Sequence, residues 1–280
     1  MSDSGGVATR VAVRKTYKLF IGGKFPRSES GRTYQVQDSN VALASRKDLR
    51  DAVVAARAAV KGWSGATAYN RGQILYRVAE MLEGRREQFV ALGEPAGEVD
   101  AAIDRWVWYA GWSDKLPQVY GGVNPVAGPY FNLSTPEPTG VVGVVAPAEP
   151  SLLGLVSVVA PVIVSGNTSV VLASPTRPLA AVTLAEVLAT SDLPGGVVNV
   201  LTGTITETAP WLASHLDVDA LDLTGVADPQ LAVELEQAAA GNLKRVLRPA
   251  VGSVDWSADP GTRRMTTFLE TKTVWHPKGT

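Results

Sequence analysis

The chain contains no cysteine and only two histidines, His215 and His276. The lack of cysteine excludes disulfides, thiolate metal ligands and a cysteine nucleophile. The two histidines lie far apart in the sequence, which argues against a histidine-based metal cluster and against a Ser-His-Asp triad. The sequence therefore predicts neither a metal site nor a catalytic centre built on these residue types.

The sequence also lacks a long hydrophobic run and an excess of one charge. Its most apolar stretch, residues 151–165, is shorter than the roughly 18 residues that a membrane-spanning helix needs. Residues 1–10 have no apolar core of the kind found in a secretory signal. Lysine and arginine total 26 against 27 acidic residues, a net charge of −1, so we expect no nucleic-acid or membrane partner. A cytoplasmic location is the default expectation.

The residues that are present are typical of a globular protein. Apolar residues make up 45% of the 280 residues and charged residues 19%, a composition that folds. Residues 1–16 are expected to form a flexible leader. The stretch YKLFIGGKF, residues 17–25, predicts a hairpin around Gly22 and Gly23. Apolar side chains that recur on one face predict three helices, over residues 45–63, 70–92 and 99–116.

The third of these helices carries a cluster of aromatic residues. Such a cluster has two interpretations, a ligand cage or the packing of one helix face against the rest of the protein. We favour packing, because aromatic residues at helical spacing more often belong to a core. The residues concerned are Trp106, Trp108, Tyr109 and Trp112.

Three segments have other patterns. Residues 117–138 are rich in glycine and proline, with short β-prone pieces, and predict a protruding two-stranded ribbon. Residues 253–267 are polar, and we interpret them as a linker. Residues 268–280 begin with FLETKTVWH, whose alternation predicts a final edge strand.

From Gly140 onward, β-prone and helical runs alternate regularly. Continuous β-branched runs indicate strands that are buried on both faces, and their alternation with helices predicts an α/β fold with a doubly wound parallel sheet. Ligands of such sheets bind at the carboxyl ends of the strands. The strand runs are GVVGVVA, TSVVLA, GVVNVL, ALDLTG and LKRVLR, and the helical runs are residues 151–164, 179–190, 206–215 and 229–240.

Several of these segments, taken in order, resemble the aldehyde dehydrogenase superfamily. The resemblance extends over residues 17–277, and it rests on many segments in series rather than on one motif. The matching segments are YAGWSDK (109–115), EPTGVVGVVAP (137–147), GNTSVVL (166–172), LPGGVVNVLTG (193–203), HLDVDALDLTG (215–225), NLKRVL (242–247) and the tail FLETKTVWHP.

This resemblance implies a domain organisation. Residues 139–252 would form a Rossmann-like cofactor-binding fold, preceded by the hairpin and helices of residues 17–116. The ribbon at 117–138 and the strand at 268–280 would form an oligomerisation element. In the family a catalytic domain lies between the cofactor-binding fold and the last strand, and here the linker at 253–267 stands in its place.

The positions that carry the family's chemistry hold other residues here. The family uses a cysteine nucleophile, and this chain has none. The family's general-base glutamate falls on Pro249, which cannot transfer a proton. The family's oxyanion-binding asparagine falls on Glu149, whose carboxylate would repel a developing negative charge. The alternative that we favour for Glu149 is a solvated residue that precedes a helix.

The cofactor positions implied by the resemblance are also changed. The family's ribose-holding lysine and glutamate fall on Leu172 and Pro175, neither of which can hydrogen-bond a ribose through its side chain. In the turn near the pyrophosphate, the family's serine is Val226 and its second glycine is Gln230, which does not favour the close approach of a phosphate. The remaining candidates for NAD(P) contacts are Pro147, Thr224 and Gly225.

These substitutions predict that the chain is inactive alone, although the family consists of NAD(P)-dependent enzymes. We interpret it as a non-catalytic, pseudoenzyme-like subunit that assembles with a full-length aldehyde dehydrogenase through residues 117–138 and 268–276. The alternative is a subunit of an NAD(P)-dependent aldehyde dehydrogenase whose active site lies in the partner. A dinucleotide-binding sensor and a nonfunctional relic are the remaining hypotheses.

Overall fold

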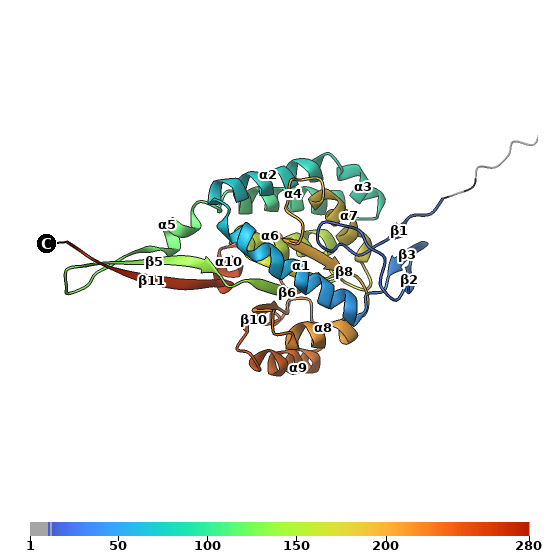
Figure 1. The fold of residues 1–280 in the computed structure, drawn as a ribbon. Coiled ribbons are helices and arrows are strands. Elements are labelled where there is room, and N and C mark those ends of the chain that lie inside the picture. Colours follow the sequence, from blue (N-terminus) through green and yellow to red (C-terminus); the bar gives the residue numbers. More distant parts are fainter. Residues whose placement is uncertain (1–10, 12, 280) are drawn as a thin grey trace, which may run out of the picture.

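A computed structural model describes residues 11 and 13–279 of the chain. Most of the predicted leader, residues 1–10 and 12, therefore lies outside the described residues, and the leader's last residue belongs to strand β1, Thr16–Tyr17. Figure 1 shows a body of helices packed around a sheet and a long β-ribbon that projects from it.

The body is organised around a sheet of five strands in the order β10-β9-β6-β7-β8. All neighbouring strands in it are parallel, which confirms the predicted doubly wound α/β fold. Every residue of β6, β7, β8 and β9 is buried, which explains why their sequences are continuous β-branched runs. The strands are β6 (Val141–Val145), β7 (Thr168–Leu172), β8 (Val198–Leu201), β9 (Ala220–Asp222) and β10 (Arg245–Leu247).

Helices cover both faces of this sheet (Figure 1). On one face, α6 (Ser151–Val164) and α7 (Pro178–Leu188) share a hydrophobic cluster with Val142 and Val144 of β6. On the other, α8 (Ile205–Ser214) and α9 (Pro229–Ala240) share a second cluster with Val141 and Val145. The alternation of these four valines assigns the two clusters to opposite faces. The predicted helices at 151–164 and 229–240 match α6 and α9 residue for residue.

The N-terminal helices complete both layers. Helix α1 (Arg46–Gly65) begins with a capping box in which Asp48 N donates to Ser45 Oγ at 3.3 Å and Ser45 N donates to Asp48 Oδ2 at 2.8 Å. The single helix predicted at 70–92 is divided into α2 (Ala68–Glu83) and α3 (Arg86–Ala91). The break lies at Gly84, the C-cap of α2, where glycine disfavours helix continuation.

Helix α4 (Ala96–Ala110) carries the aromatic cluster. Trp106 and Tyr109 are fully buried in the first hydrophobic cluster, and Trp108 and Trp112 pack against it. The structure therefore confirms packing, rather than an aromatic cage, as the role of these rings.

The predicted N-terminal hairpin is present, as a short one. Ile21 and Lys24 exchange two backbone hydrogen bonds, of 2.9 and 3.0 Å, around Gly22 and Gly23, which both have positive φ. Before the turn, Leu19 N donates to Pro26 O at 3.2 Å across the hairpin, and Phe20 pairs with Val200 at the edge of β8. A second small sheet, which the sequence analysis did not predict, has the order β1-β3-β2, with β2 at Thr33–Val36 and β3 at Ser39–Ala42.

The projecting ribbon contains the two strands predicted within residues 117–138, β4 (Gly122–Asn124) and β5 (Tyr130–Pro138), together with the predicted final strand, β11 (Leu269–Pro277). Its central strand β5 pairs antiparallel with β4 and along its full length with β11. The start of the predicted ribbon instead forms the short helix α5 (Leu116–Tyr120), since Pro117 in the first turn favours a helix start.

Residues 253–267 are more ordered than a polar linker. They include helix α10 (Arg263–Thr267), in which Met265 is fully buried, and Phe268 beyond it is fully buried as well. These two side chains join the same hydrophobic cluster as α6. The polar composition hid this anchor, because only two apolar residues carry it.

Candidate functional site at the ends of the parallel strands

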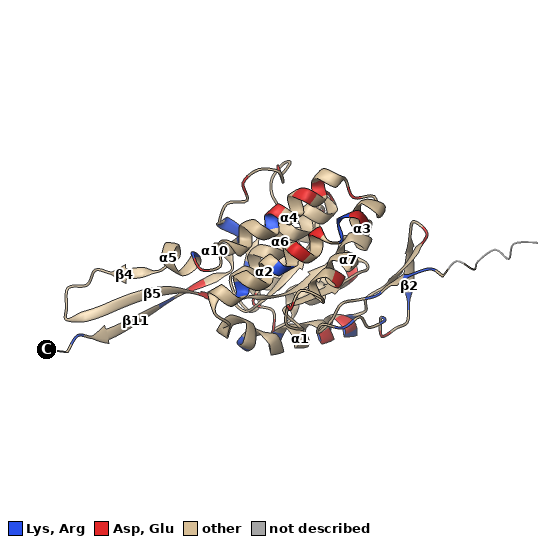
Figure 2. Ribbon diagram, turned by 90° about the horizontal axis from the view of Figure 1, so that it is seen from above, with Lys and Arg blue, Asp and Glu red and all other residues tan. Residues whose placement is uncertain are grey.

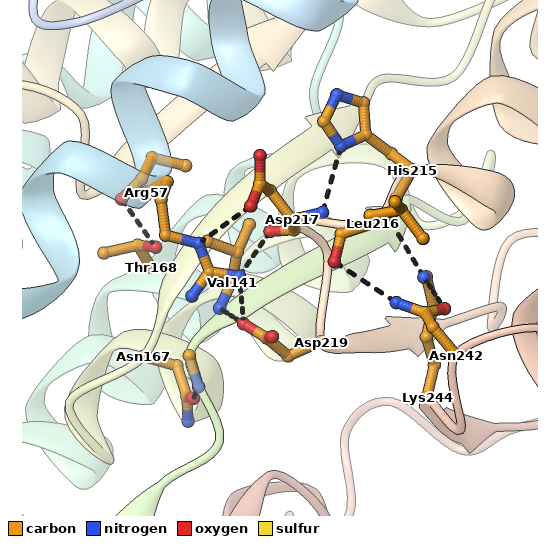
Figure 3. Close-up of polar contacts among 12 residues, drawn as sticks. Arg57, Val141, Asn167, Thr168, His215, Leu216, Asp217, Asp219, Asn242 and Lys244 are labelled. Atoms are coloured by element: carbon orange, nitrogen blue, oxygen red, sulfur yellow. Dashed lines mark hydrogen bonds and ion pairs between the residues drawn. The ribbon is translucent and has the colours of Figure 1, made fainter.

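A cluster of polar contacts joins the amino ends of the parallel strands (Figure 3). Arg57 of α1 donates from Nη2 to the carbonyl oxygen of Asp217 at 2.6 Å and to Asp219 Oδ2 at 2.7 Å. The same Asp219 oxygen accepts the backbone N–H of Val141, the first residue of β6, at 2.7 Å. The cluster thus satisfies backbone groups where the strands begin.

Neighbouring strands begin in the same way. Asn167, before β7, accepts the N–H of Gly140 at 2.7 Å and donates to the carbonyl oxygen of Phe268 at 2.8 Å. Lys244, before β10, donates to the carbonyl oxygen of His215 at 2.8 Å. Ligands of doubly wound sheets bind at the opposite, carboxyl ends. We therefore assign the amino-end cluster a structural role. This role includes fixing the start of β11, because Phe268 directly precedes that strand.

The strand order reverses between β6 and β9, so a ligand crevice is expected beyond the carboxyl ends of these two strands. Gly225, which follows β9, donates its N–H to the carbonyl oxygen of Val145 at 2.9 Å. A Cβ on Gly225 would lie 2.1 Å from the carbonyl oxygen of Ala146. The close approach that Gly225 permits is thus to the chain's own backbone.

Thr224, beside Gly225, belongs to a buried ion pair. Asp222 at the end of β9 has a fully buried side chain, and its Oδ2 lies 2.8 Å from Nη1 of Arg264. The same Nη1 donates to Thr224 Oγ1 at 2.9 Å, and the Thr224 hydroxyl donates to Asp222 Oδ1. Burial raises the pKa of Asp222, and the Arg264 charge opposes that rise. The polar groups at this strand end are therefore engaged with one another.

The other predicted cofactor positions have diverse surroundings. Pro147 is buried and packs against α6. Leu172 is 1% exposed within the second hydrophobic cluster, and Val226 is buried in the same cluster. Pro175 is half-buried, and Gln230 is exposed in the first turn of α9.

The start of α6 is occupied by a carboxylate from α4. Glu98 Oε1 accepts the N–H groups of Leu152 and Leu153 at 2.8 and 3.1 Å, which satisfies donors that a helix start leaves free. Glu149 lies just before this helix, has a side chain that is 67% exposed, and lies 3.5 Å from Nε of Arg177. The helix start therefore already carries negative charge and offers little to an oxyanion.

Pro249 follows β10 and is half-buried. It lines an open groove of about 710 Å³ whose charged residues are mainly basic, among them Arg248 and Arg263. Nothing in its side chain can accept or donate a proton.

Comparisons with known proteins place this geometry in a family. The sequence model of the aldehyde dehydrogenase family matches residues 33–252. The chain belongs to the aldehyde dehydrogenase family. It is 32% identical over 266 residues to aldehyde dehydrogenase, cytosolic 1, of Elephantulus edwardii, covering 88% of this chain and 52% of that protein. It is 33% identical over 248 residues to aldehyde dehydrogenase family 2 member B4, mitochondrial, of Arabidopsis thaliana, covering 82% of this chain and 45% of that protein.

Solved structures support the same conclusion. The NAD⁺ complex of aldehyde dehydrogenase from Bacillus cereus superposes with a TM-score of 0.78 at 26% identity, over 83% of this chain and 50% of that one. A putative aldehyde dehydrogenase from Burkholderia cenocepacia superposes with a TM-score of 0.77 at 30% identity, over 82% and 49%. The chain spans about half the length of the relatives that it matches.

The aldehyde dehydrogenase fold implies a nicotinamide dinucleotide, and the residues present do not fit one at the positions that the resemblance assigns. The Leu172 side chain is apolar and buried, and Pro175 has no polar side-chain group. The Thr224 hydroxyl is held by Asp222 and Arg264. The side chains of Leu172 and Pro175 therefore supply no hydrogen bond to a ribose.

Neither a candidate metal site nor a candidate membrane-spanning helix is found in residues 11 and 13–279. Among these residues, no three histidine, aspartate or glutamate side chains gather in a way that could hold a metal ion. Within the same part of the chain, no helix combines the length and apolarity that crossing a membrane requires.

Sequence reasoning missed two arginines of this aldehyde dehydrogenase fold, Arg105 and Arg264, that join residues 253–267 to the body. Arg264 lies in the segment that we interpreted as a linker. Arg105 of α4 is 8% exposed, and its Nη2 donates to the carbonyl oxygens of Trp256 at 2.7 Å and Ala258 at 3.1 Å. The sequence did contain a signal for Arg105. Arg105 lies among the aromatic residues of α4, and a charged side chain on a buried face needs a polar partner.

Proposed function

We propose that this member of the aldehyde dehydrogenase family is a non-catalytic subunit that assembles with a full-length, cysteine-bearing aldehyde dehydrogenase. The supporting observation is a projecting three-stranded sheet in a chain that has no cysteine, and the resemblance assigns Glu149 and Pro249 to the family's catalytic positions. Any aldehyde oxidation by the assembly then belongs to the partner's own site.

The surface chemistry of the ribbon supports an interface. Residues 116–136 include no charged residue, and Figure 2 shows the charged residues concentrated on the body rather than along the ribbon. Large apolar side chains nevertheless lie exposed there, and such patches mark interaction sites. They include Val123 at 64%, Phe131 at 54% and Trp275 at 57% exposure.

The backbone of the ribbon supports the same proposal. Among the described residues, β11 pairs on one side only, with β5, so its other edge presents free donors and acceptors that can bind a strand of another chain. Lys272 near the root of β11 pairs with Glu137 at 3.0 Å. The outer part of the strand, residues 273–277, contains no Lys, Arg, Asp or Glu.

The proposal extends to the cofactor and the compartment. We propose that the isolated chain does not bind NAD⁺ or NADP⁺ tightly, because Leu172 and Pro175 give the ribose no side-chain partner. A cytoplasmic location is proposed on the similarity to aldehyde dehydrogenase, cytosolic 1, of Elephantulus edwardii.

Co-expression tests the proposal. This chain, tagged, is expressed with a full-length aldehyde dehydrogenase from the same source and captured. We expect co-capture, and at least tenfold less of it with Phe131→Asp or Trp275→Asp. Val233→Asp is the matched control, because Val233 is a 48% exposed apolar residue on α9, a helix that packs on α8 and β10 of the body. Capture that is insensitive to the ribbon variants, or NAD-dependent aldehyde oxidation by the isolated chain, would contradict the proposal.

A further inference from the structure

A small cavity lies between α4, α6 and the segment that leads into α10. Its volume is about 170 Å³, and its lining includes Arg105, Tyr109, Ser157, Trp256 and Arg264. We call it the arginine cavity. At roughly 30 Å³ of liquid volume per water molecule, it has room for a small molecule but not for a dinucleotide.

Two guanidinium groups border the arginine cavity, and both are largely removed from water. Arg105 is 8% exposed, and the Arg264 side chain is 19% exposed. The hydrogen bonds of Arg105 go to neutral acceptors, namely the two carbonyl oxygens of residues 256 and 258 and Ser157 Oγ at 3.2 Å. Burial lowers the pKa of Arg105; the Asp259 carboxylate opposes that fall, and the repulsion from Arg264 adds a smaller lowering.

Two aspartates also line the cavity, and both are exposed. Asp255 Oδ1 accepts the Ser257 N–H at 2.9 Å and the Ser257 hydroxyl at 2.6 Å. Asp259 Oδ1 accepts the Gly261 N–H at 2.8 Å. Both carboxylates therefore stabilise local turns. The only carboxylate within ion-pairing distance of Arg264 among the described residues is Asp222, and none lies within that distance of Arg105.

Tyr109 adds a hydrogen-bond donor. Its side chain is fully buried, and its hydroxyl has no hydrogen-bond partner among the residues that the structure describes. Burial raises the pKa of Tyr109 to about 12, so the phenol remains protonated at neutral pH. A buried hydroxyl without a partner is unfavourable, and a ligand that accepts its hydrogen bond relieves that cost.

We propose that the arginine cavity binds a small oxyanion, of the carboxylate or phosphate type, between Arg105 and Arg264 with the Tyr109 hydroxyl as a donor. Guanidinium groups bind such oxyanions with charge-assisted hydrogen bonds. The bound anion also joins α4 to α10, and α10 leads directly into β11. The ligand would therefore stabilise the root of the ribbon, whether or not the ribbon joins an aldehyde dehydrogenase.

Thermal unfolding and calorimetry of the 280-residue chain test this site. The chain is prepared in a buffer free of phosphate and carboxylate and titrated separately with inorganic phosphate, acetate and succinate. Sodium chloride at matched ionic strength controls for screening. We expect at least one oxyanion to raise the unfolding midpoint saturably where chloride does not, and the arm that responds identifies the anion type. No saturable response in any arm would overturn the proposal.

Tyr109→Phe is the decisive variant, because it removes one oxygen and keeps the packing of the ring. We expect at least tenfold weaker binding of the anion that responds, in a protein whose folding without the anion is preserved. Arg264→Lys should also weaken binding tenfold or more. Arg263→Lys is the matched control, since Arg263 is exposed and does not line the cavity. Equal binding by Tyr109→Phe and the wild-type chain would overturn the assignment.

Discussion

The sheet of the body and the sheet of the ribbon use similar β-prone residues with opposite results. Every residue of β6, β7 and β8 is buried, whereas no residue of β11 is buried. The body buries its central strands β6, β7, β8 and β9 under helices on both faces, and the ribbon leaves Val123, Phe131 and Trp275 in water. The difference indicates that this chain covers the central strands of its body but leaves apolar side chains of the ribbon available for contact with another chain.

Matched substitutions of valine by aspartate should give the largest contrast between the two sheets. Val144 in β6 is 0% exposed and Val123 in β4 is 64% exposed. Val144→Asp buries an unpaired charge and should cost more than about 4 kcal/mol in the free energy of unfolding. Val123→Asp should change it by no more than about 0.5 kcal/mol, yet reduce capture of the partner. Urea unfolding measures both, and equal losses of stability would break the comparison.

The join between body and ribbon should be the next most sensitive place. Arg264→Ala leaves the buried Asp222 carboxylate without its counter-charge and should cost about 3 kcal/mol at pH 8. The exposed neighbour variant Arg263→Ala should cost less than about 0.5 kcal/mol. If the two variants are equally stable, the ion pair does not hold α10 on the sheet.

The pH dependence of stability should show a smaller effect of the same group. Burial raises the pKa of Asp222 above its ordinary 3.8. The protonated carboxyl therefore contributes to the free energy of unfolding, fully below about pH 3.8, and this contribution is lost as pH rises through the raised pKa. Asp222→Asn cannot titrate. We therefore expect the unfolding free energy of wild type minus that of the variant to fall as pH rises from about 4, in denaturant titrations up to pH 8. A difference that grows with pH would mean that Arg264 outweighs burial.

The smallest predicted effect concerns the Tyr109 hydroxyl. Without an added oxyanion, Tyr109→Phe should leave stability unchanged or raise it by up to about 1 kcal/mol, because it deletes an unpaired buried donor. Calorimetric melting measures the change. A loss of more than about 1 kcal/mol would show that the hydroxyl has a partner within the protein.

The sequence predicted the parts whose signals are local. The bounds of α6 and α9 agree with the prediction because Pro150 or Asp228 marks the start and the apolar run defines the length. The small sheet β1-β3-β2 was missed, since it contains a parallel pair from distant segments and a turn at Gln37 with φ of 52°. Helix α10 was missed because two buried apolar side chains, Met265 and Phe268, anchor an otherwise polar segment.

The candidate site was predictable in part. The residues at the family's catalytic and ribose positions stay a prediction from the resemblance, which assigns them because they follow recognisable strands. The contact between Arg264 and Asp222 joins residues 42 positions apart, and no spacing rule within one element relates them. The same holds for Arg105, whose partners at 256 and 258 lie more than 150 positions away.

The mass of the co-expressed assembly under native conditions tests the central claim most directly. The account predicts particles that contain this chain and the full-length aldehyde dehydrogenase in a fixed ratio, and their loss when Trp275→Asp is introduced into this chain. Two separate populations, with this chain alone as a stable monomer that binds no such enzyme, would contradict it.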